Sequence, residues 1–172
     1  MTPEKLPSSE YASSYAAYVS AVPDGDIVEL LEQQPDVLRD LAKRVPGDRE
    51  LFRYAPDKWT IREVYGHLSD AERVFGYRLV SISRGDTASL PGFDENVYVA
   101  AANFNARPLQ ALADEFALLR GGNLMAMRAL DADAWRRVGL ANNTPVSVRA
   151  LAYVMAGHVN HHVAILRARY AV

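Results

Sequence analysis

The residues best suited to chemistry are three histidines that stand close together near residue 160. They lie in the segment GHVNHH, residues 157–162, and are three of the four histidines in the chain. His158 and His162 are four residues apart, so on a helix they lie one turn apart and their imidazoles can turn toward one point. This HxxxH spacing is typical of a transition-metal site on a helix.

An HxxxH pair supplies two ligands, whereas an open catalytic zinc or nickel site generally takes a third from elsewhere. His67 is the one histidine outside the segment, and it falls in the apolar stripe of a helix expected over residues 61–84. A bundle that packs the two helices side by side would bring all three rings to one interior pocket. We therefore predict a metal site on His67, His158 and His162.

The predicted cofactor is one divalent transition metal. Imidazole ligands suit zinc, nickel, iron and copper, and affinity alone does not choose among these metals. We expect zinc or nickel first, with iron, manganese and copper as the other candidates. His161 lies about 60° round the helix from His158, so we expect it at the edge of the bundle or beside the site.

A simpler interpretation is that the inward histidines are ordinary core residues, each hydrogen-bonded to a carbonyl or a carboxylate. For His158 and His162 this interpretation requires two desolvated rings to find such partners in the same small volume. The spacing alone does not decide between the two interpretations.

The segments that carry the histidines follow a helical period, with apolar side chains every three to four residues. We expect four long helices over residues 27–44, 61–84, 109–130 and 148–170. Thr60 and Glu63 have the spacing of a capping box, and Ser147 is the expected cap of the last helix. Shorter helical pieces are expected over residues 11–19 and around Trp135. Because few segments alternate with period two, the pattern predicts an all-α four-helix bundle with short additional helical segments.

The composition indicates one domain over residues 1–172, with an irregular or short-helical lead-in at 1–25 and the bundle at 26–172. A net charge of −2, without long runs of either sign, gives no footprint for nucleic acid or an anionic membrane. The chain has no cysteine and no apolar run near the length that spans a bilayer, so we expect a cytoplasmic protein. Apolar faces on all four helices would also allow a homodimer.

Several segments resemble the DinB-like, or YfiT-like, superfamily of metal-dependent hydrolases. They are YAPDKWTIREVYGHLSDAER at 54–73, LPGFDE at 90–95, GHVNHH at 157–162 and ILR at 165–167. The resemblance covers nearly the whole chain, and it implies a four-helix bundle with a divalent metal on three histidines that match His67, His158 and His162. The chain departs from the pattern at Val159, where related sequences often carry an acidic residue.

The activity implied by the resemblance is broad, because relatives transfer low-molecular-weight thiols such as bacillithiol, isomerise maleylpyruvate with mycothiol, or belong to ergothioneine biosynthesis. We expect an enzyme that acts on a small-molecule substrate, in which the metal lowers the pKa of water or of a low-molecular-weight thiol. This covers a hydrolase and a thiol S-transferase, and the fold does not select between them.

Asp70 and one of the two neighbours Asp94 and Glu95 are candidate catalytic helpers. Asp70 stands one turn beyond His67, and Asp94 and Glu95 end a turn-rich loop over residues 85–95. Each has a simpler role open to it: Asp70 as the ion-pair partner of Arg73, and Glu95, like its neighbour Asp94, as a cap for a helix that begins near Asn96.

Two other classes of function stay open. In a non-catalytic metal- or small-ligand-binding stress-response protein, the metal would stabilise the bundle and a fourth protein ligand would be expected. A serine hydrolase using Ser69 or Ser147 has no Gly-x-Ser-x-Gly segment to support it.

Overall fold

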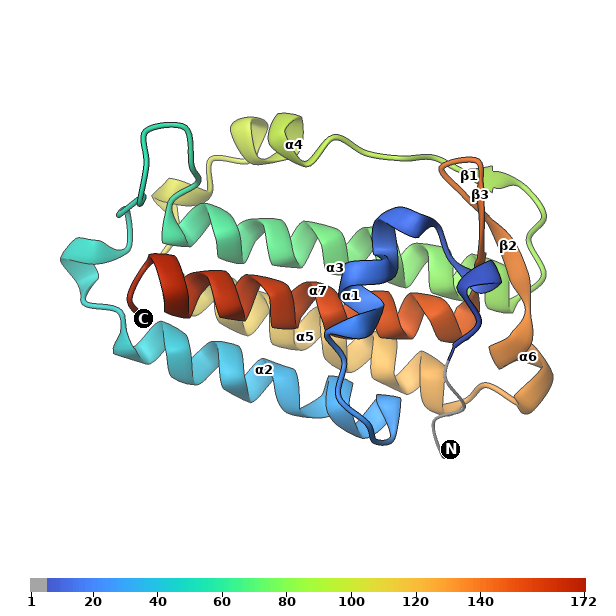
Figure 1. Cartoon of the computed structure of the whole chain (residues 1–172). Helices are drawn as coiled ribbons and strands as arrows, with labels where there is room; N and C mark the ends of the chain where they lie inside the picture. The colour runs from blue at the N-terminus through green and yellow to red at the C-terminus, as the bar shows by residue number, and fades with distance from the viewer. Residues whose placement is uncertain (1–5) are drawn as a thin grey trace.

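Four long helices form the body of the molecule, in a computed structural model that describes residues 6–172 (Figure 1). They are α2 (Ile27–Arg44), α3 (Ile61–Ser83), α5 (Leu109–Arg128) and α7 (Val148–Arg169). Helix α2 packs against α5 and α7, and α3 packs against the same two helices, so α2 and α3 lie diagonally across the bundle although they follow each other in the chain. The predicted fold class and long helices are confirmed, with ends that differ by no more than two residues.

Polar side chains fix where the helices begin. The Thr60 side chain accepts a hydrogen bond from the Glu63 amide, and the Glu63 carboxylate accepts one from the Thr60 amide, which completes the predicted capping box of α3. Ser147 accepts from the Ala150 amide at the start of α7, and Asp26 caps α2 in the same manner. Because the caps fix the first residue of α3 and of α7, they also fix the turn and the face of the helix on which each histidine lies.

A buried polar network joins all four long helices. Arg120 of α5 donates to both carboxylate oxygens of Glu72 of α3, at 2.8 and 2.9 Å, and to Gln34 of α2 at 2.7 Å. The Gln34 amide then donates to the Ala156 carbonyl and to the Asn160 side chain of α7, at 2.8 and 2.9 Å. Because Asn160 belongs to the GHVNHH segment, the network fixes the rotation of α7 that turns its histidines inward.

Shorter elements cover the bundle. Helix α1 (Ala16–Ser20), which follows 3₁₀ turns at Ser8–Glu10 and Ser13–Tyr15, lies across α7 (Figure 1). It crosses at Gly157, where a Cβ atom would stand 2.0 Å from the Tyr18 carbonyl oxygen, so glycine permits the contact. Helix α4 (Glu95–Ala101) packs on α3, and α6 (Ala132–Arg136) contains the predicted turn around Trp135.

A small three-stranded sheet at one end of the bundle is a feature that the sequence pattern did not predict (Figure 1). Strand β1 (Ser89–Leu90) pairs in parallel with β2 (Val138–Ala141), and β2 pairs antiparallel with β3 (Thr144–Ser147). Of residues 144–147, only Ser147 has a role predicted from the sequence, as the cap of the last helix, and strands of two to four residues are too short for alternation to be visible. Asn142 and Asn143 form the turn with φ of 52° and 58°, a left-handed pair typical of a two-residue hairpin.

The predicted lead-in at 1–25 is partly outside the described residues, since its first five positions are not described. Among residues 6–172, no helix is long and apolar enough to cross a bilayer.

Candidate metal centre

Three buried imidazole rings meet between α3 and α7. His67 comes from α3, and His158 and His162 come from successive turns of α7. Their ring centroids are 4.6 to 4.9 Å apart, and one ring nitrogen from each lies within 4.8 Å of the others. The structure thus brings together the three histidines that the spacing singled out, in an arrangement that could hold one metal ion.

The hydrogen bonding of these rings distinguishes a metal site from an ordinary polar core. His67 Nε2 faces His158 Nε2 at 2.9 Å, and His67 Nδ1 is buried without a partner. Among residues 6–172, none of the three rings bonds to a carbonyl or a carboxylate, which the core-histidine interpretation requires. A metal ion fits this donor set, because it can accept a lone pair from each ring at once.

Burial controls the charge of the cluster. It lowers the pKa of His67 to about 4 and that of His162 to about 3, and the neighbouring imidazoles add to the effect at His162. Burial, followed by the same mutual repulsion, also places the pKa of His158 well below its ordinary range. The rings are therefore neutral near pH 7, and the neutral ring is the form that binds a metal.

The described residues offer three protein ligands to the ion and no fourth, since no other histidine, aspartate or glutamate of residues 6–172 joins the group. Aromatic side chains support the rings: Trp59 packs on His67 at 4.7 Å and Tyr18 on His158 at 5.5 Å between centroids. His161 is exposed beside the cluster and contacts Tyr18 at 5.4 Å, in agreement with a position at the edge.

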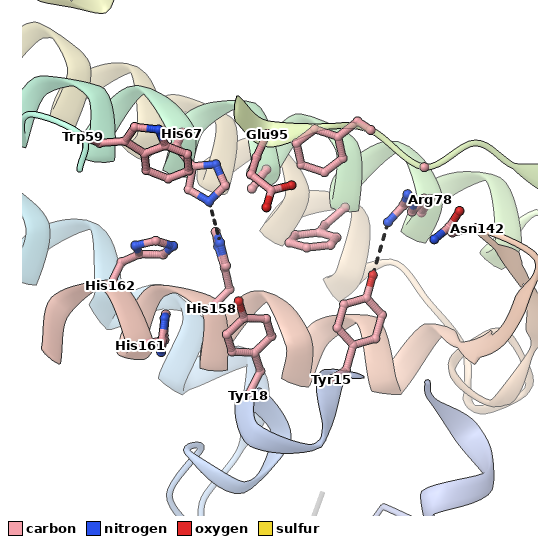
Figure 2. Close-up of a pocket in the computed structure, with 14 residues that line it drawn as sticks. Tyr15, Tyr18, Trp59, His67, Arg78, Glu95, Asn142, His158, His161 and His162 are labelled. Carbon is pink, nitrogen blue, oxygen red and sulfur yellow. Dashed lines mark hydrogen bonds between the residues drawn. The ribbon is translucent and has the colours of Figure 1, made fainter. Parts of the chain in front are cut away.

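A pocket of about 360 Å³ opens onto the cluster. Its walls come from α3, α7, the N-terminal segment, the loop before α4 and the turn between β2 and β3. The metal-binding candidates lie at one end of it, and Arg78 and Asn142 lie at the other (Figure 2).

The candidate carboxylates differ in position. Glu95 is the first residue of α4, and its carboxylate points into the pocket between the two ends (Figure 2). Its neighbour Asp94 is the cap of α4, accepting from the Asn96 and Val97 amides. This leaves Glu95 free of the capping role.

Asp70 does not line the pocket. Burial raises the pKa of its carboxyl, which Arg73 opposes, and the two side chains form an ion pair at 3.5 Å. The serines of the hydrolase alternative also lie elsewhere: Ser69 is fully buried off the pocket, and Ser147 bonds to Glu10 while it caps α7.

Sequence reasoning missed Arg78, a pocket residue that is only 2% exposed. It lies eleven residues after His67 on α3, and His67, Ala71, Phe75 and Arg78 all line the pocket along one stripe. The position was readable from the sequence, but an arginine at the end of an apolar stripe is ordinarily taken as solvent-exposed.

Comparison with known proteins agrees with this architecture. The YfiT protein of Bacillus subtilis, described as a probable metal-dependent hydrolase with an unusual four-helix bundle topology, superimposes with a TM-score of 0.77 at 17% identity, over 98% of this chain and 94% of that one. A mycothiol-dependent maleylpyruvate isomerase gives a TM-score of 0.67 at 13% identity, over 85% of this chain and 61% of that one. At these identities the likeness concerns the fold.

The match to the isomerase covers 61% of that chain, so this chain spans less than two thirds of its length. No curated protein matches the sequence. The model of the DinB superfamily matches residues 30–166, which include all three clustered histidines. The chain therefore belongs to the DinB superfamily.

Proposed function

We propose that the protein is a metal-dependent enzyme that activates water or a low-molecular-weight thiol for attack on a small-molecule substrate. The ligands would be His67, His158 and His162, with zinc or nickel as the favoured metal. One observation carries the proposal: three buried, neutral rings face one another, and no carbonyl or carboxylate of residues 6–172 bonds to them. Unpaired polar groups are costly to bury, so this arrangement calls for a common partner.

When bound, the metal would act as a Lewis acid that lowers the pKa of a water or thiol at its open position. The protein's contribution is to hold the ligands and to limit the access of water. Trp59 covers His67, and Tyr18 covers His158, so both rings keep their orientation. A pocket of about 360 Å³ is within the range that holds small-molecule ligands.

Glu95 is the proposed base, since it is the carboxylate that lines the pocket. It would take the proton that the nucleophile loses. Burial and the negative charge of Glu95 raise the pKa of Tyr18, so the Tyr18 hydroxyl remains a hydrogen-bond donor beside the site. We expect Glu95→Gln to retain metal and to lose activity by about 10²- to 10⁴-fold.

Three candidate ligands without a fourth among residues 6–172 support catalysis over a purely structural metal, because structural zinc sites are closed by four protein ligands. The choice between water and thiol draws support from the relatives alone: one is described as a probable hydrolase and another as mycothiol-dependent. Both chemistries therefore belong in the test.

The metal is tested first. Protein purified without a histidine tag should contain about one transition metal per chain by elemental analysis, and His158→Ala should lose it. His161→Ala is the matched control, since it removes an exposed imidazole from the same helix and should leave the metal content unchanged. A metal content far below one per chain, or full retention in His158→Ala, refutes the site.

Activity is tested with a screen of esters, amides and alkylating electrophiles, each with and without added bacillithiol, mycothiol, glutathione or cysteine. A thiol transferase should require both the metal and a thiol, whereas a hydrolase should require the metal alone. Activity that survives the loss of metal in His158→Ala contradicts both versions.

A further inference from the structure

Arg78 is a buried cation that lacks a counter-charge. It is 2% exposed, yet no carboxylate of residues 6–172 lies within ion-pair distance of its guanidinium. Arg120, the other fully buried arginine of the bundle, binds both carboxylate oxygens of Glu72. Burying a charge without a partner is expensive, so the difference between these two arginines needs a reason.

The neighbours of Arg78 are neutral and few. Its guanidinium donates to the Pro91 carbonyl at 2.7 Å and to the Tyr15 hydroxyl at 3.5 Å, and its Nε is left without an acceptor. Glu95 lines the same pocket but makes no ion pair with it among the described contacts. The guanidinium therefore keeps both its charge and part of its hydrogen-bonding capacity.

The surroundings of Arg78 form the end wall of the pocket. The loop after β1 supplies Gly92, and the Pro91 carbonyl of the same loop accepts from Arg78. The β2–β3 turn supplies Asn142, whose side chain lies beside Arg78 (Figure 2). A Cβ atom at Gly92 would stand 2.8 Å from the Asn142 side-chain oxygen, so glycine is what lets the amide reach this position. The unpredicted sheet thus brings the Asn142 side chain and the Pro91 carbonyl to Arg78 of α3.

The Phe75 ring contacts a group at each end of the pocket, so it sets an upper limit on the distance between the two ends. Its ring centroid is 5.7 Å from that of His158 and 5.9 Å from the guanidinium carbon of Arg78. The guanidinium therefore lies at most about 12 Å from the His158 ring. One extended small molecule can reach both.

We propose that Arg78, assisted by Asn142, binds an anionic group of the substrate, a carboxylate or a phosphate, while the reacting end of the same molecule lies at the histidines. A guanidinium suits both anions because it binds them through two parallel hydrogen bonds. The proposal rests on the proposed function for the identity of the reacting end. The anion-binding role of Arg78 stands on its own geometry and can be measured without metal.

The first experiment uses wild-type protein from which metal has been removed by chelation. Hexanoate, hexyl phosphate and hexanol share a chain and differ in the head group, and their binding is followed as a shift in melting temperature at equal ionic strength. We expect hexanoate or hexyl phosphate to raise the melting temperature, by roughly 3–6 °C at a tenfold excess over the dissociation constant, and hexanol to raise it less. Comparison of the two anions shows which group the site prefers. Equal effects of both anions and hexanol overturn the proposal.

Variants assign the preference to the residue. Arg78→Met should bind hexanol as well as wild type does and should lose at least tenfold in affinity for the preferred anion. Arg84→Met is the matched control, because it removes an exposed arginine from the end of the same helix and should keep the preference. If Arg78→Met does not fold, Arg78→Gln takes its place. An anion preference that survives the loss of Arg78 overturns the proposal.

The final arm repeats the comparison on zinc-loaded protein with 6-mercaptohexanoate and 6-mercaptohexanol. The wild-type protein should bind 6-mercaptohexanoate at least tenfold more tightly than 6-mercaptohexanol, and Arg78→Met should bind the two compounds with equal affinity. If the metal-free anion preference holds but zinc adds no affinity for either thiol, the anion site stands and the thiol version of the proposed function fails. If zinc raises the affinity for both thiols equally and the protein shows no preference for the anion, the metal site stands and Arg78 does not bind an anionic group.

Discussion

Replacement of Gly157 by alanine tests how closely α1 is seated on α7. Glycine in the middle of a helix costs about 1 kcal/mol relative to alanine, so a freely exposed position would gain stability from this change. At Gly157 the new Cβ atom would stand 2.0 Å from the Tyr18 carbonyl oxygen and 2.5 Å from its carbon. The backbone of α1 would have to retreat by about 1 Å or more to restore an ordinary contact. Overpacking costs about 1–3 kcal/mol, and the upper value applies because backbone cannot rotate away.

The expected net result for Gly157→Ala is a loss of about 2 kcal/mol, or roughly 4–8 °C in melting temperature for a chain of this size. Gly122→Ala in α5 is the matched control, since a Cβ atom there meets nothing within 4 Å, and it should raise stability by up to about 1 kcal/mol. Denaturant unfolding measures both, and hydrogen exchange over residues 13–21 should be faster in Gly157→Ala alone. The reasoning is refuted if Gly157→Ala stabilises the protein as Gly122→Ala does and leaves that exchange unchanged.

Three further predictions concern stability. Chelation should lower the melting temperature by roughly 8–16 °C when free metal had stood at about a thousand times its dissociation constant, whereas an unchanged melting temperature would speak against a folded-state metal site. Arg120→Met leaves the Glu72 carboxylate buried without a counter-charge, so it should cost about 3–5 kcal/mol in denaturant unfolding; wild-type stability in this variant would show that the network is dispensable. Hydrogen bonds from Arg149 lower the pKa of Glu10, so the stabilisation is present above the ordinary pKa of a glutamate and is lost as the pH falls through the lower folded value. Glu10→Gln should therefore lose stability at pH 7 and depend less on pH between 5 and 3, and parallel pH profiles for the two proteins would contradict this.

The histidine end of the pocket could be predicted from the sequence because its information is local. A period of 3.6 residues places His158 and His162 on one face of a helix. The Thr60 cap fixes the first residue of α3, and with it the face of that helix on which His67 lies. What the spacing could not provide was the environment of the rings. Only the packed structure shows that they face one another, and not carbonyls or carboxylates of the described residues.

The other end of the pocket depends on contacts that no local pattern reveals. Asn142 reaches the pocket because β2 pairs with β1 from a segment about fifty residues earlier, and each strand is too short to show alternation. The burial of Arg78 likewise results from that sheet and from Tyr15 of the N-terminal segment. Asp70 differs, because its ion pair with Arg73 lies within one helical turn and was one of the two roles read from the sequence. Only the packed structure shows that its side chain does not line the pocket.

Helix α3 sets the distance between the two ends of the pocket. His67 and Arg78 belong to one stripe of this helix, and a rise of 1.5 Å per residue puts their Cα atoms about 16 Å apart. This separation cannot change while the helix remains intact, and the Arg120–Glu72 pair secures α3 to the neighbouring helix α5. The other walls, which carry Tyr15, Tyr18 and Asn142, come from segments outside the four long helices. We therefore expect substitutions in those segments to change how wide a molecule the pocket accepts. The bundle itself should set the distance between an anionic group and a reacting group that are bound at the same time.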